Sequence, residues 1–311
     1  MKLLHELQKY VSETCGLSPD KPMECKTEQP LATYTYMRTG GVAEAVVFPR
    51  TPAMAAAVMS FCRNQKTPIA VVGKGSNTLF ATTRFSGIIL STARLTRITH
   101  HGNTITALAG AALPLVCRYA AEHGLSGLEA LYGIPGSIGG AIYMNAGAYG
   151  TEIADLSPMT EVVFSDDPLK VRTYSAAEQE FSYRQSIFTS LPNAIITSVT
   201  LSLSPGRTPR DIKDSMHAFL ERRKMAQPLE FPSLGSIYKR PNNGYAAEMI
   251  EKAGLKNASV GGAAVSGKHA GFIINTGGAT AADVLALMEL IEEKVYRKFN
   301  VRLTPEICIV R

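Results

Sequence analysis

Two glycine-rich segments contain the first residues whose types and spacing suggest a chemical role. The earlier one, Gly73–Asn77 (GKGSN), directly follows the apolar pair Val71 and Val72. Successive unhindered backbone N–H groups in such a turn can close around a phosphate group. An ordinary tight turn after a strand would have the same composition, so this segment alone leaves both interpretations open.

The second segment, Gly133–Gly140 (GIPGSIGG), has small residues at short intervals and continues into Ala141–Gly150 (AIYMNAGAYG). A bulky ligand could lie against bare backbone there. Together the two segments predict a phosphate-bearing cofactor between them. Neither is the Gly-x-Gly-x-x-Gly fingerprint that opens a helix in a βαβ unit, which disfavours a Rossmann dinucleotide-binding domain.

A third segment, Gly262–His269 (GAAVSGKH), imitates the spacing of a nucleoside-triphosphate-binding loop. In that loop a Ser or Thr after the lysine ligates magnesium, whereas His269 occupies the position here. No apolar strand leads cleanly into the segment and no helical pattern follows it. The sequence therefore disfavours a triphosphatase, and we expect no metal site.

The elements that must hold these segments are short and of mixed type. Over 311 residues the composition is 45% hydrophobic and 19% charged, which indicates an ordered protein of about two domains, or three if one is small. Hydrophobic spacing predicts helices over 3–11, 52–64, 113–121 and 210–224, and strands over 68–72, 87–91, 104–109, 141–144, 161–164 and 194–203. This pattern is typical of an α+β fold.

The clearest helix lies near the C-terminus. Thr280 is placed to cap it and Asp283 to complete a capping box. Its apolar stripe comprises Ala281, Val284, Leu285, Met288, Ile291, Val295 and Phe299. Upstream, Ser204-Pro205-Gly206 interrupts the pattern, and we expect a domain boundary near residue 205.

Charge and cysteine content favour a cytoplasmic protein that binds small molecules. The net charge of +6 is spread along the chain, which suits anionic small molecules as well as nucleic acid. No aromatic-rich RNA motif or recognition helix supports nucleic-acid binding. The five cysteines form no CxxC pair, and the N-terminus lacks the unbroken apolar core of a signal peptide, so we expect a reducing cytoplasm and no membrane insertion.

Many stretches, in order along nearly the whole chain, closely resemble the UDP-N-acetylenolpyruvoylglucosamine reductases (UDP-N-acetylmuramate dehydrogenases, MurB), flavoenzymes of bacterial cell-wall synthesis. The matching stretches are TYMRTGG (35–41) before Phe48-Pro49, the turn 73–77, GLE (127–129) leading into 133–150, YRQSIF (183–188), QPLEFPSLGS (227–236), AGLK (253–256), 265–276 and Pro305-Glu306. A set of this size is far more specific than any single glycine-rich segment.

The resemblance implies an α+β protein with an FAD-binding domain of the vanillyl-alcohol-oxidase type, built from two α+β subdomains over 1–66 and 67–205. A C-terminal substrate-binding α+β domain would cover 206–311, and its last strand could return to the FAD domain. The short connection between Arg184 and Ser236 resembles the subclass that lacks a long insertion. The chemistry implied is a two-step hydride relay, in which NADPH reduces non-covalent FAD and leaves before UDP-N-acetylglucosamine enolpyruvate docks. We expect a monomer.

The resemblance also assigns three catalytic residues, for which the sequence alone offers ordinary alternatives. Arg184 would pair with the substrate carboxylate and spread developing negative charge, or it could be a surface arginine in an ion pair. Ser236 would donate a proton to carbon, or it could be a turn residue after Gly235. Glu306 would be protonated, or share a proton, during the reaction, or it could be a solvated carboxylate at a strand end.

Further contacts follow from the same resemblance. The residues expected to contact FAD are Gly73, Lys74, Gly75, Ser76, Asn77, Thr78, Leu79, Gly133, Ile134, Pro135, Gly136, Ser137, Gly139, Gly140, Ala141, Asn145 and Gly147. Tyr183, Lys239 and Lys268 are expected to touch the substrate. Two positions depart from the usual family pattern: Lys74 interrupts a commonly all-glycine turn, and Arg240 stands where many relatives have asparagine. The alternative function is another oxidoreductase on the same FAD scaffold, because a fold does not fix a reaction.

Overall fold

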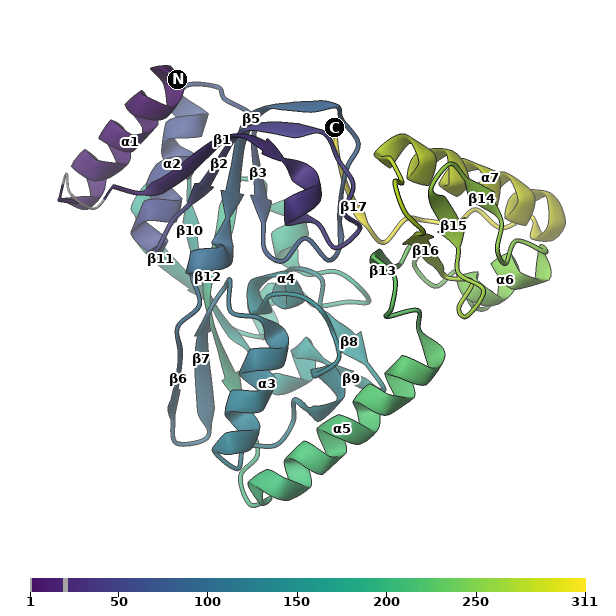
Figure 1. The fold of residues 1–311 in the computed structure, drawn as a ribbon. Helices are drawn as coiled ribbons and strands as arrows, with labels where there is room; N and C mark the ends of the chain where they lie inside the picture. Colours follow the sequence, from purple (N-terminus) through teal and green to yellow (C-terminus); the bar gives the residue numbers. More distant parts are fainter. Residues whose placement is uncertain (1, 19–21) are drawn as a thin grey trace. The chain divides into compact units, whose positions relative to one another are not determined.

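A computed structural model describes residues 2–18 and 22–311 of the protein (Figure 1). The chain forms two compact units that interleave along the sequence. Unit 1 consists of Met1–Glu28, Glu44–Lys74 and Ser86–Glu221, and unit 2 consists of Gln29–Ala43, Gly75–Phe85 and Arg222–Arg311. Both units combine helices with strands, as the sequence predicted.

One sheet has four strands, in the order β1 (Glu24–Pro30), β2 (Val42–Phe48), β5 (Arg84–Ser91) and β3 (Ile69–Val72). Two helices, α1 (Lys2–Cys15) and α2 (Pro52–Asn64), accompany it. The Thr51 side chain accepts a hydrogen bond from the Met54 backbone N–H at 3.2 Å and Pro52 occupies the first turn, so α2 begins where its sequence predicts. Buried side chains of α1, α2, β2 and β5 form one apolar cluster.

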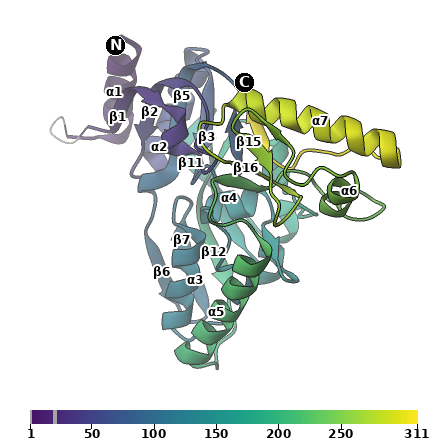
Figure 2. The ribbon, with the colours of Figure 1, turned by 45° about the vertical axis from the view of Figure 1, so that its right-hand side comes forward.

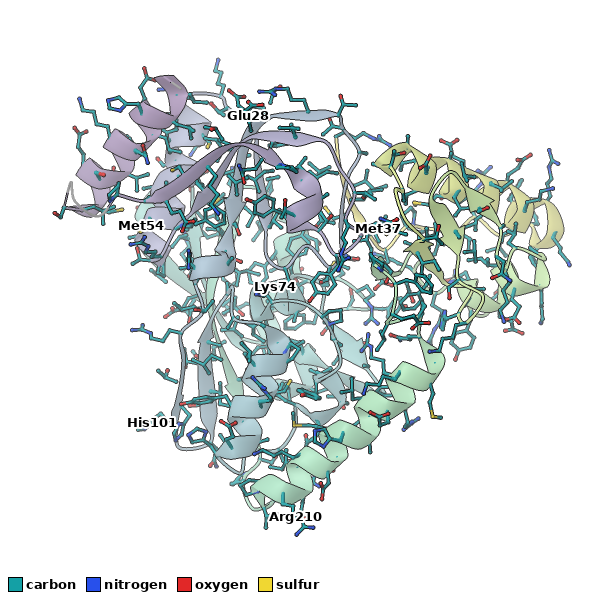
Figure 3. The ribbon with its side chains drawn as sticks, in the orientation of Figure 1. Glu28, Met37, Met54, Lys74, His101 and Arg210 are labelled. Atoms are coloured by element: carbon teal, nitrogen blue, oxygen red, sulfur yellow. The ribbon has the colours of Figure 1, made fainter. Side chains whose placement is uncertain are left out.

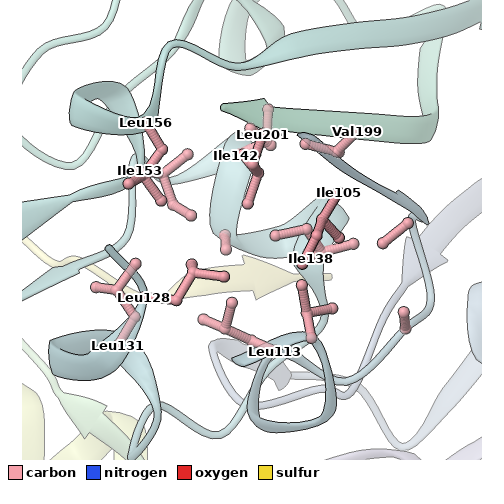
Figure 4. Close-up of a cluster of buried hydrophobic side chains, with 14 of the residues drawn as sticks. Ile105, Leu113, Leu128, Leu131, Ile138, Ile142, Ile153, Leu156, Val199 and Leu201 are labelled. Carbon is pink, nitrogen blue, oxygen red and sulfur yellow. The ribbon is translucent and has the colours of Figure 1, made fainter. Parts of the chain in front are cut away.

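The larger sheet of unit 1 is antiparallel throughout, in the order β11 (Asp167–Tyr174), β10 (Met159–Phe164), β12 (Ala194–Ser202), β7 (Thr104–Leu108) and β6 (Ile98–His101). Two helices, α3 (Leu113–Glu122) and α4 (Ile138–Tyr143), pack their apolar residues against its strands (Figure 4). The long helix α5 (Pro209–Ala226) adds Ile212 and Met216 to this core. A small hairpin, β8 (Gly147–Ala148) and β9 (Thr151–Glu152), follows α4.

Unit 2 contains an antiparallel sheet in the order β13 (Ser233–Ser236), β16 (Phe272–Asn275), β15 (Ala263–Val265) and β14 (Ser259–Val260). Helices α6 (Ala246–Lys252) and α7 (Ala281–Phe299) bury their apolar faces in the same cluster as this sheet. Figure 2 shows α7 as the long yellow helix near the C-terminus. A separate parallel pair joins β4 (Thr78–Phe80) to β17 (Cys308–Val310).

Short 3₁₀ helices connect several of these elements: Leu31–Tyr34, Thr92–Arg94, Glu129–Leu131, Ile153–Leu156, Ala177–Gln179 and Ile187–Ser190. Over residues 2–18 and 22–311, no helix is both long enough and apolar enough to cross a bilayer.

Most predicted elements are confirmed, and one was wrong. Helix α7 begins at Thr280 with both hydrogen bonds of the predicted capping box. Residues 141–144, predicted as a strand, instead form the end of the short helix α4. Ser137 caps the start of this helix, where its hydroxyl accepts a hydrogen bond from the Gly140 N–H at 3.3 Å. A short buried apolar run fits helix and strand equally well, so periodicity could not separate them. The three predicted domains, 1–66, 67–205 and 206–311, stay predictions.

Candidate active site

The two glycine-rich segments approach each other at Gly73 and Ser137, both of which belong to unit 1. A Cβ atom placed on Gly73 would lie 2.3 Å from the Ser137 hydroxyl oxygen, so only glycine allows this approach. Ser137 is 3% exposed and caps α4. Gly73 therefore packs against the protein itself, and contacts of either segment with a cofactor stay predictions.

The turn after β3 keeps backbone donors available. Lys74 is labelled in this turn in Figure 3. Gly75 has φ +63°, and a Cβ there would lie 1.9 Å from the Tyr34 carbonyl oxygen, while its own carbonyl accepts a hydrogen bond from the Tyr36 N–H at 3.0 Å. None of the described residues accepts a hydrogen bond from the backbone N–H groups of Lys74, Gly75 or Ser76. Successive N–H groups of this kind fit a phosphate anion.

The second segment uses its backbone differently. The N–H groups of Ile138 and Gly139 donate to the carbonyls of Ala111 and Ala109, both at 2.9 Å. A Cβ on Gly139 would lie 2.7 Å from the Ala109 Cβ atom. Gly139 is thus required for packing, whereas Gly140 is exposed. The remaining residues of the loop that were expected to contact a cofactor, Gly133, Ile134, Pro135 and Gly136, are all partly exposed.

Three other expected cofactor contacts lie deeper in the protein. Ala141 and Leu79 are buried in the cores of unit 1 and unit 2, respectively, so only their backbones could reach a ligand. Asn145 is 1% exposed, and its carboxamide is hydrogen-bonded to Glu152 and Ser182. The Asn145 side chain therefore has its partners within the protein, and the cofactor contact expected of Asn145, which stays a prediction, would be made by its backbone.

Arg184 stands on a tight turn in unit 1. Ser182 and Gln185 exchange two backbone hydrogen bonds of 3.1 Å, and Arg184 between them has φ +55°. A left-handed conformation costs a non-glycine residue about 1 kcal/mol or more, so the surroundings must hold it. The guanidinium donates a hydrogen bond to the Gly147 carbonyl at 3.2 Å and lies 5.1 Å from the centre of the Tyr183 ring.

Ser236 and Glu306 come together in unit 2. The Glu306 N–H donates to the Ile237 carbonyl at 2.8 Å, which places Glu306 beside the end of β13. No described residue hydrogen-bonds to the hydroxyl of Ser236, which is partly exposed after Gly235 at φ +76°. The hydroxyl is therefore available to a ligand.

Asn77 connects this pair to the glycine-rich turn. Its side-chain N–H donates to the Glu306 carbonyl at 3.1 Å, and its own carbonyl accepts a hydrogen bond from the Cys308 N–H at 2.9 Å. Thr78 then enters β4 and pairs with Cys308. The end of the predicted phosphate-binding turn and two predicted catalytic residues consequently share one corner of unit 2.

The expected substrate contacts have different surroundings. Tyr183 is 44% exposed beside Arg184. Lys239 is partly exposed and its backbone N–H bonds the Thr304 carbonyl at 2.9 Å, near Glu306. Lys268 instead donates to the Lys224 carbonyl and lies 3.9 Å from a Glu230 carboxylate oxygen. The Arg240 guanidinium lies 4.6 Å from the centre of the Tyr245 ring.

The segment Gly262–His269 contains β15 and the first residues of the connection to β16, and no helix follows it directly. The buried Ser266 hydroxyl accepts the backbone N–H groups of Lys268 and His269 at 3.1 and 3.3 Å. Burial lowers the pKa of His269. Within the part of the chain that the structure describes, no cluster of three His, Cys, Asp or Glu side chains could hold a metal ion, and the five cysteines are free thiols.

Glu129 stabilises the chain just before the second glycine-rich segment. Its carboxylate accepts hydrogen bonds from the Ser126 hydroxyl at 2.6 Å, the Gly127 N–H at 2.7 Å and the Arg207 guanidinium at 2.9 Å. Burial opposes ionisation of this carboxyl, but the hydrogen bonds and the Arg207 charge outweigh burial and hold the pKa of Glu129 below its usual value.

Comparison with known proteins identifies the family. A family model described as the C-terminal domain of UDP-N-acetylenolpyruvoylglucosamine reductase matches residues 227–310, and one described as an FAD binding domain matches 43–167. A curated UDP-N-acetylenolpyruvoylglucosamine reductase from Latilactobacillus sakei is 38% identical over 294 residues, which cover 94% of this chain and 96% of the relative. The chain belongs to this reductase family.

Other members support the assignment. The reductase of Lactobacillus helveticus is 41% identical over 92% of this chain and 94% of its own. The crystal structure of the MurB reductase from Thermus caldophilus matches with a TM-score of 0.77 and 32% identity, over 93% of this chain and 99% of that one. The predicted fold class, an FAD-binding domain with a C-terminal α+β domain of the MurB type, is confirmed.

The residues present fit the FAD that this family membership implies. The N–H groups of Lys74, Gly75 and Ser76, which have no hydrogen-bond acceptor among the described residues, suit its diphosphate. Sequence reasoning missed Glu152 and Ser182, the partners of Asn145. The available signal was Asn145 itself, a polar residue between apolar neighbours directly after α4.

Proposed function

We propose that this protein is an FAD-dependent UDP-N-acetylmuramate dehydrogenase, which uses NADPH to reduce UDP-N-acetylglucosamine enolpyruvate for bacterial peptidoglycan synthesis. The observation that carries the proposal is the match to named reductases over more than nine tenths of both chains. Both substrates are small polar molecules of the cytoplasm, where we place the enzyme, acting as a monomer.

When bound, FAD would supply the hydride carrier between NADPH and the substrate. The backbone N–H groups of Lys74, Gly75 and Ser76 would hold its diphosphate, because none of the described residues accepts a hydrogen bond from them and successive backbone N–H groups can enclose an anion. The Lys74 ammonium adds a positive charge on the same turn. The three N–H groups belong to one short stretch of chain, so they can act together.

Arg184 would bind the enolpyruvyl carboxylate. Delivery of hydride to the terminal alkene carbon leaves negative charge on the neighbouring carbon and its carboxylate, and a planar guanidinium can pair with that group through two hydrogen bonds. The left-handed turn fixes where the guanidinium starts, and its bond to the Gly147 carbonyl limits its rotation. The fixed charge therefore needs little reorganisation as the reaction proceeds.

Ser236 would complete the reduction by donating its hydroxyl proton to the carbon that bears the negative charge. Its hydroxyl has no partner among the described residues, so it can turn toward a substrate, and a serine recovers its proton from water. The Glu306 backbone N–H bonds the carbonyl of Ile237, the residue after Ser236, and the Glu306 side chain would act in its protonated form, since a carboxylate near the substrate would oppose the developing charge. One hydride from NADPH and one proton balance the saturation of the double bond.

The proposal is tested by incubating the purified protein with NADPH and the enolpyruvyl nucleotide and analysing the product by mass spectrometry. The expected product carries two more hydrogen atoms than the substrate, with one NADPH consumed for each product molecule. A flavin that NADPH reduces but that never transfers hydride to this substrate would indicate a different oxidoreductase on the same scaffold.

A further inference from the structure

Asn145 lies at the centre of a hydrogen-bond network that ends at Arg184. Its side-chain NH₂ group donates to a Glu152 carboxylate oxygen at 2.8 Å and to the Ser182 carbonyl at 3.1 Å. Its side-chain oxygen accepts the Ala154 N–H at 3.1 Å. All these residues belong to unit 1. The carboxamide is thus nearly saturated by the protein.

The bond to Ser182 bears directly on the catalytic turn. The Ser182 carbonyl also accepts the Gln185 N–H, so Asn145 holds one end of the turn whose third residue is Arg184. Asn145 itself has φ +43°, a conformation that asparagine tolerates better than most residues. Asn145 and Arg184 both have left-handed backbone conformations, and the buried Asn145 carboxamide connects them through its hydrogen bond to Ser182.

Further constraints on Arg184 come from the same loop. Gly147, two residues after Asn145, accepts the guanidinium hydrogen bond, and the Ser186 hydroxyl bonds the Tyr143 carbonyl at 2.9 Å. A Cβ on Gly147 would lie 3.4 Å from an Arg184 guanidinium nitrogen and 2.8 Å from Glu152 Cγ. The loop after α4 therefore surrounds the turn from several sides, with Asn145 as its buried polar contact.

We propose that Asn145 is a positioning residue for Arg184, which fixes the left-handed turn through the Ser182 carbonyl and so sets where the guanidinium meets the substrate carboxylate. This inference rests on the proposed function, because it takes Arg184 as the carboxylate-binding group. Misplacement of a catalytic group by about 1 Å can lower a rate by ~10²-fold. Loss of the Asn145 donor should therefore affect the reaction of the enolpyruvyl substrate and spare flavin reduction by NADPH.

The test compares Asn145→Asp/Glu152→Gln with Glu152→Gln in the FAD-loaded protein. Aspartate keeps the size of the side chain and its acceptor for the Ala154 N–H, while glutamine at 152 can donate the hydrogen bond that Asn145 supplied. The double variant therefore loses the donor to Ser182 at unchanged net charge, although one negative charge moves from residue 152 to residue 145. The expected result is an oxidative half-reaction ~10²-fold slower than in Glu152→Gln, with reductive half-reactions that agree within about twofold. Asn193→Asp, an exposed position in the same unit, is the control for the amide change.

A second readout does not depend on activity. Trypsin cleaves after arginine, so loosening of the turn should accelerate cleavage at Arg184–Gln185 by about tenfold or more, while cleavage after the exposed Arg210 stays constant. Equal slowing of both half-reactions, or unchanged cleavage at Arg184, would overturn the inference. Inactivity of the unaltered protein toward the enolpyruvyl nucleotide would refute the proposed function instead, and the proteolysis would still decide whether Asn145 holds the turn.

Discussion

Gly75→Ala should damage the protein far more than Gly102→Ala, although both glycines have similar backbone conformations. Gly75 has φ +63° and Gly102 has φ +53°. An added Cβ at Gly75 would lie 1.9 Å from the Tyr34 carbonyl oxygen and 2.9 Å from the Thr35 Cα atom, whereas at Gly102 it meets nothing within 4 Å. Comparison of the two substitutions therefore separates the energetic cost of a left-handed backbone from the cost of a steric clash at the added Cβ.

The expected magnitudes follow from these contacts. A side chain in the left-handed region costs about 1–2 kcal/mol at either position. At Gly75 the Tyr34 backbone must also move by more than 1 Å, roughly, to reach van der Waals contact, which adds about 1–3 kcal/mol of overpacking. Loss of the hydrogen bond from Tyr36 to Gly75 adds about 1 kcal/mol. We expect the free energy of unfolding to fall by about 3–6 kcal/mol for Gly75→Ala and about 1–2 kcal/mol for Gly102→Ala.

Urea unfolding of the FAD-loaded variants, followed by far-ultraviolet circular dichroism, measures both values. Flavin fluorescence on dilution measures cofactor release in parallel. Because the N–H groups of Lys74, Gly75 and Ser76 share the displaced turn, Gly75→Ala should also weaken FAD binding, and Gly102→Ala should leave it unchanged. Equal destabilisation by the two substitutions would refute the argument from space, and unchanged FAD affinity in Gly75→Ala would refute the role given to the turn.

Three other predictions concern the catalytic residues and their support. Ser236→Ala should slow oxidation of the reduced flavin by the enolpyruvyl substrate by ~10²- to 10⁴-fold and leave reduction by NADPH nearly unchanged, as stopped-flow absorbance under anaerobic conditions can measure; equal slowing of both steps would make Ser236 structural. NADPH and the enolpyruvyl nucleotide should compete for one site, giving ping-pong kinetics with substrate inhibition, and a stable ternary complex would contradict this. Glu129→Gln should lower the free energy of unfolding by about 1–3 kcal/mol at pH 7. The pKa of Glu129 is lower in the folded than in the unfolded protein. The difference in free energy of unfolding between Glu129→Gln and the unaltered protein should therefore be fully present above the unfolded pKa and disappear as the pH falls through the folded pKa. A difference that does not change with pH would contradict the charge-assisted hydrogen bonds.

Local sequence signals predicted the isolated elements well. Thr51-Pro52 and Thr280 with Asp283 mark the starts of α2 and α7, because a cap satisfies backbone donors that only its immediate neighbours can reach. Such features depend on a few adjacent residues and can be inferred without the fold.

Features that depend on distant residues were inaccessible to the same reasoning. The sequence does not indicate that Glu306 lies beside Ile237 or that Asn77 bonds the Glu306 carbonyl, since strand pairing across the chain creates both contacts. The family resemblance placed Asn145 among the expected cofactor contacts, and that contact stays a prediction. The bonds of Asn145 to Glu152 and Ser182 arise only when the hairpin β8–β9 and the Arg184 turn fold back onto α4.

The proposed function depends on hydride transfer from NADPH to the enolpyruvyl nucleotide through one bound flavin. The most direct measurement reduces the purified yellow protein with NADPH in the absence of oxygen, removes NADP⁺ by gel filtration, and mixes the reduced protein with UDP-N-acetylglucosamine enolpyruvate. We expect the absorbance of oxidised flavin to return without oxygen, with one UDP-N-acetylmuramate formed for each flavin oxidised. A flavin that stays reduced until oxygen is admitted would contradict the proposed function.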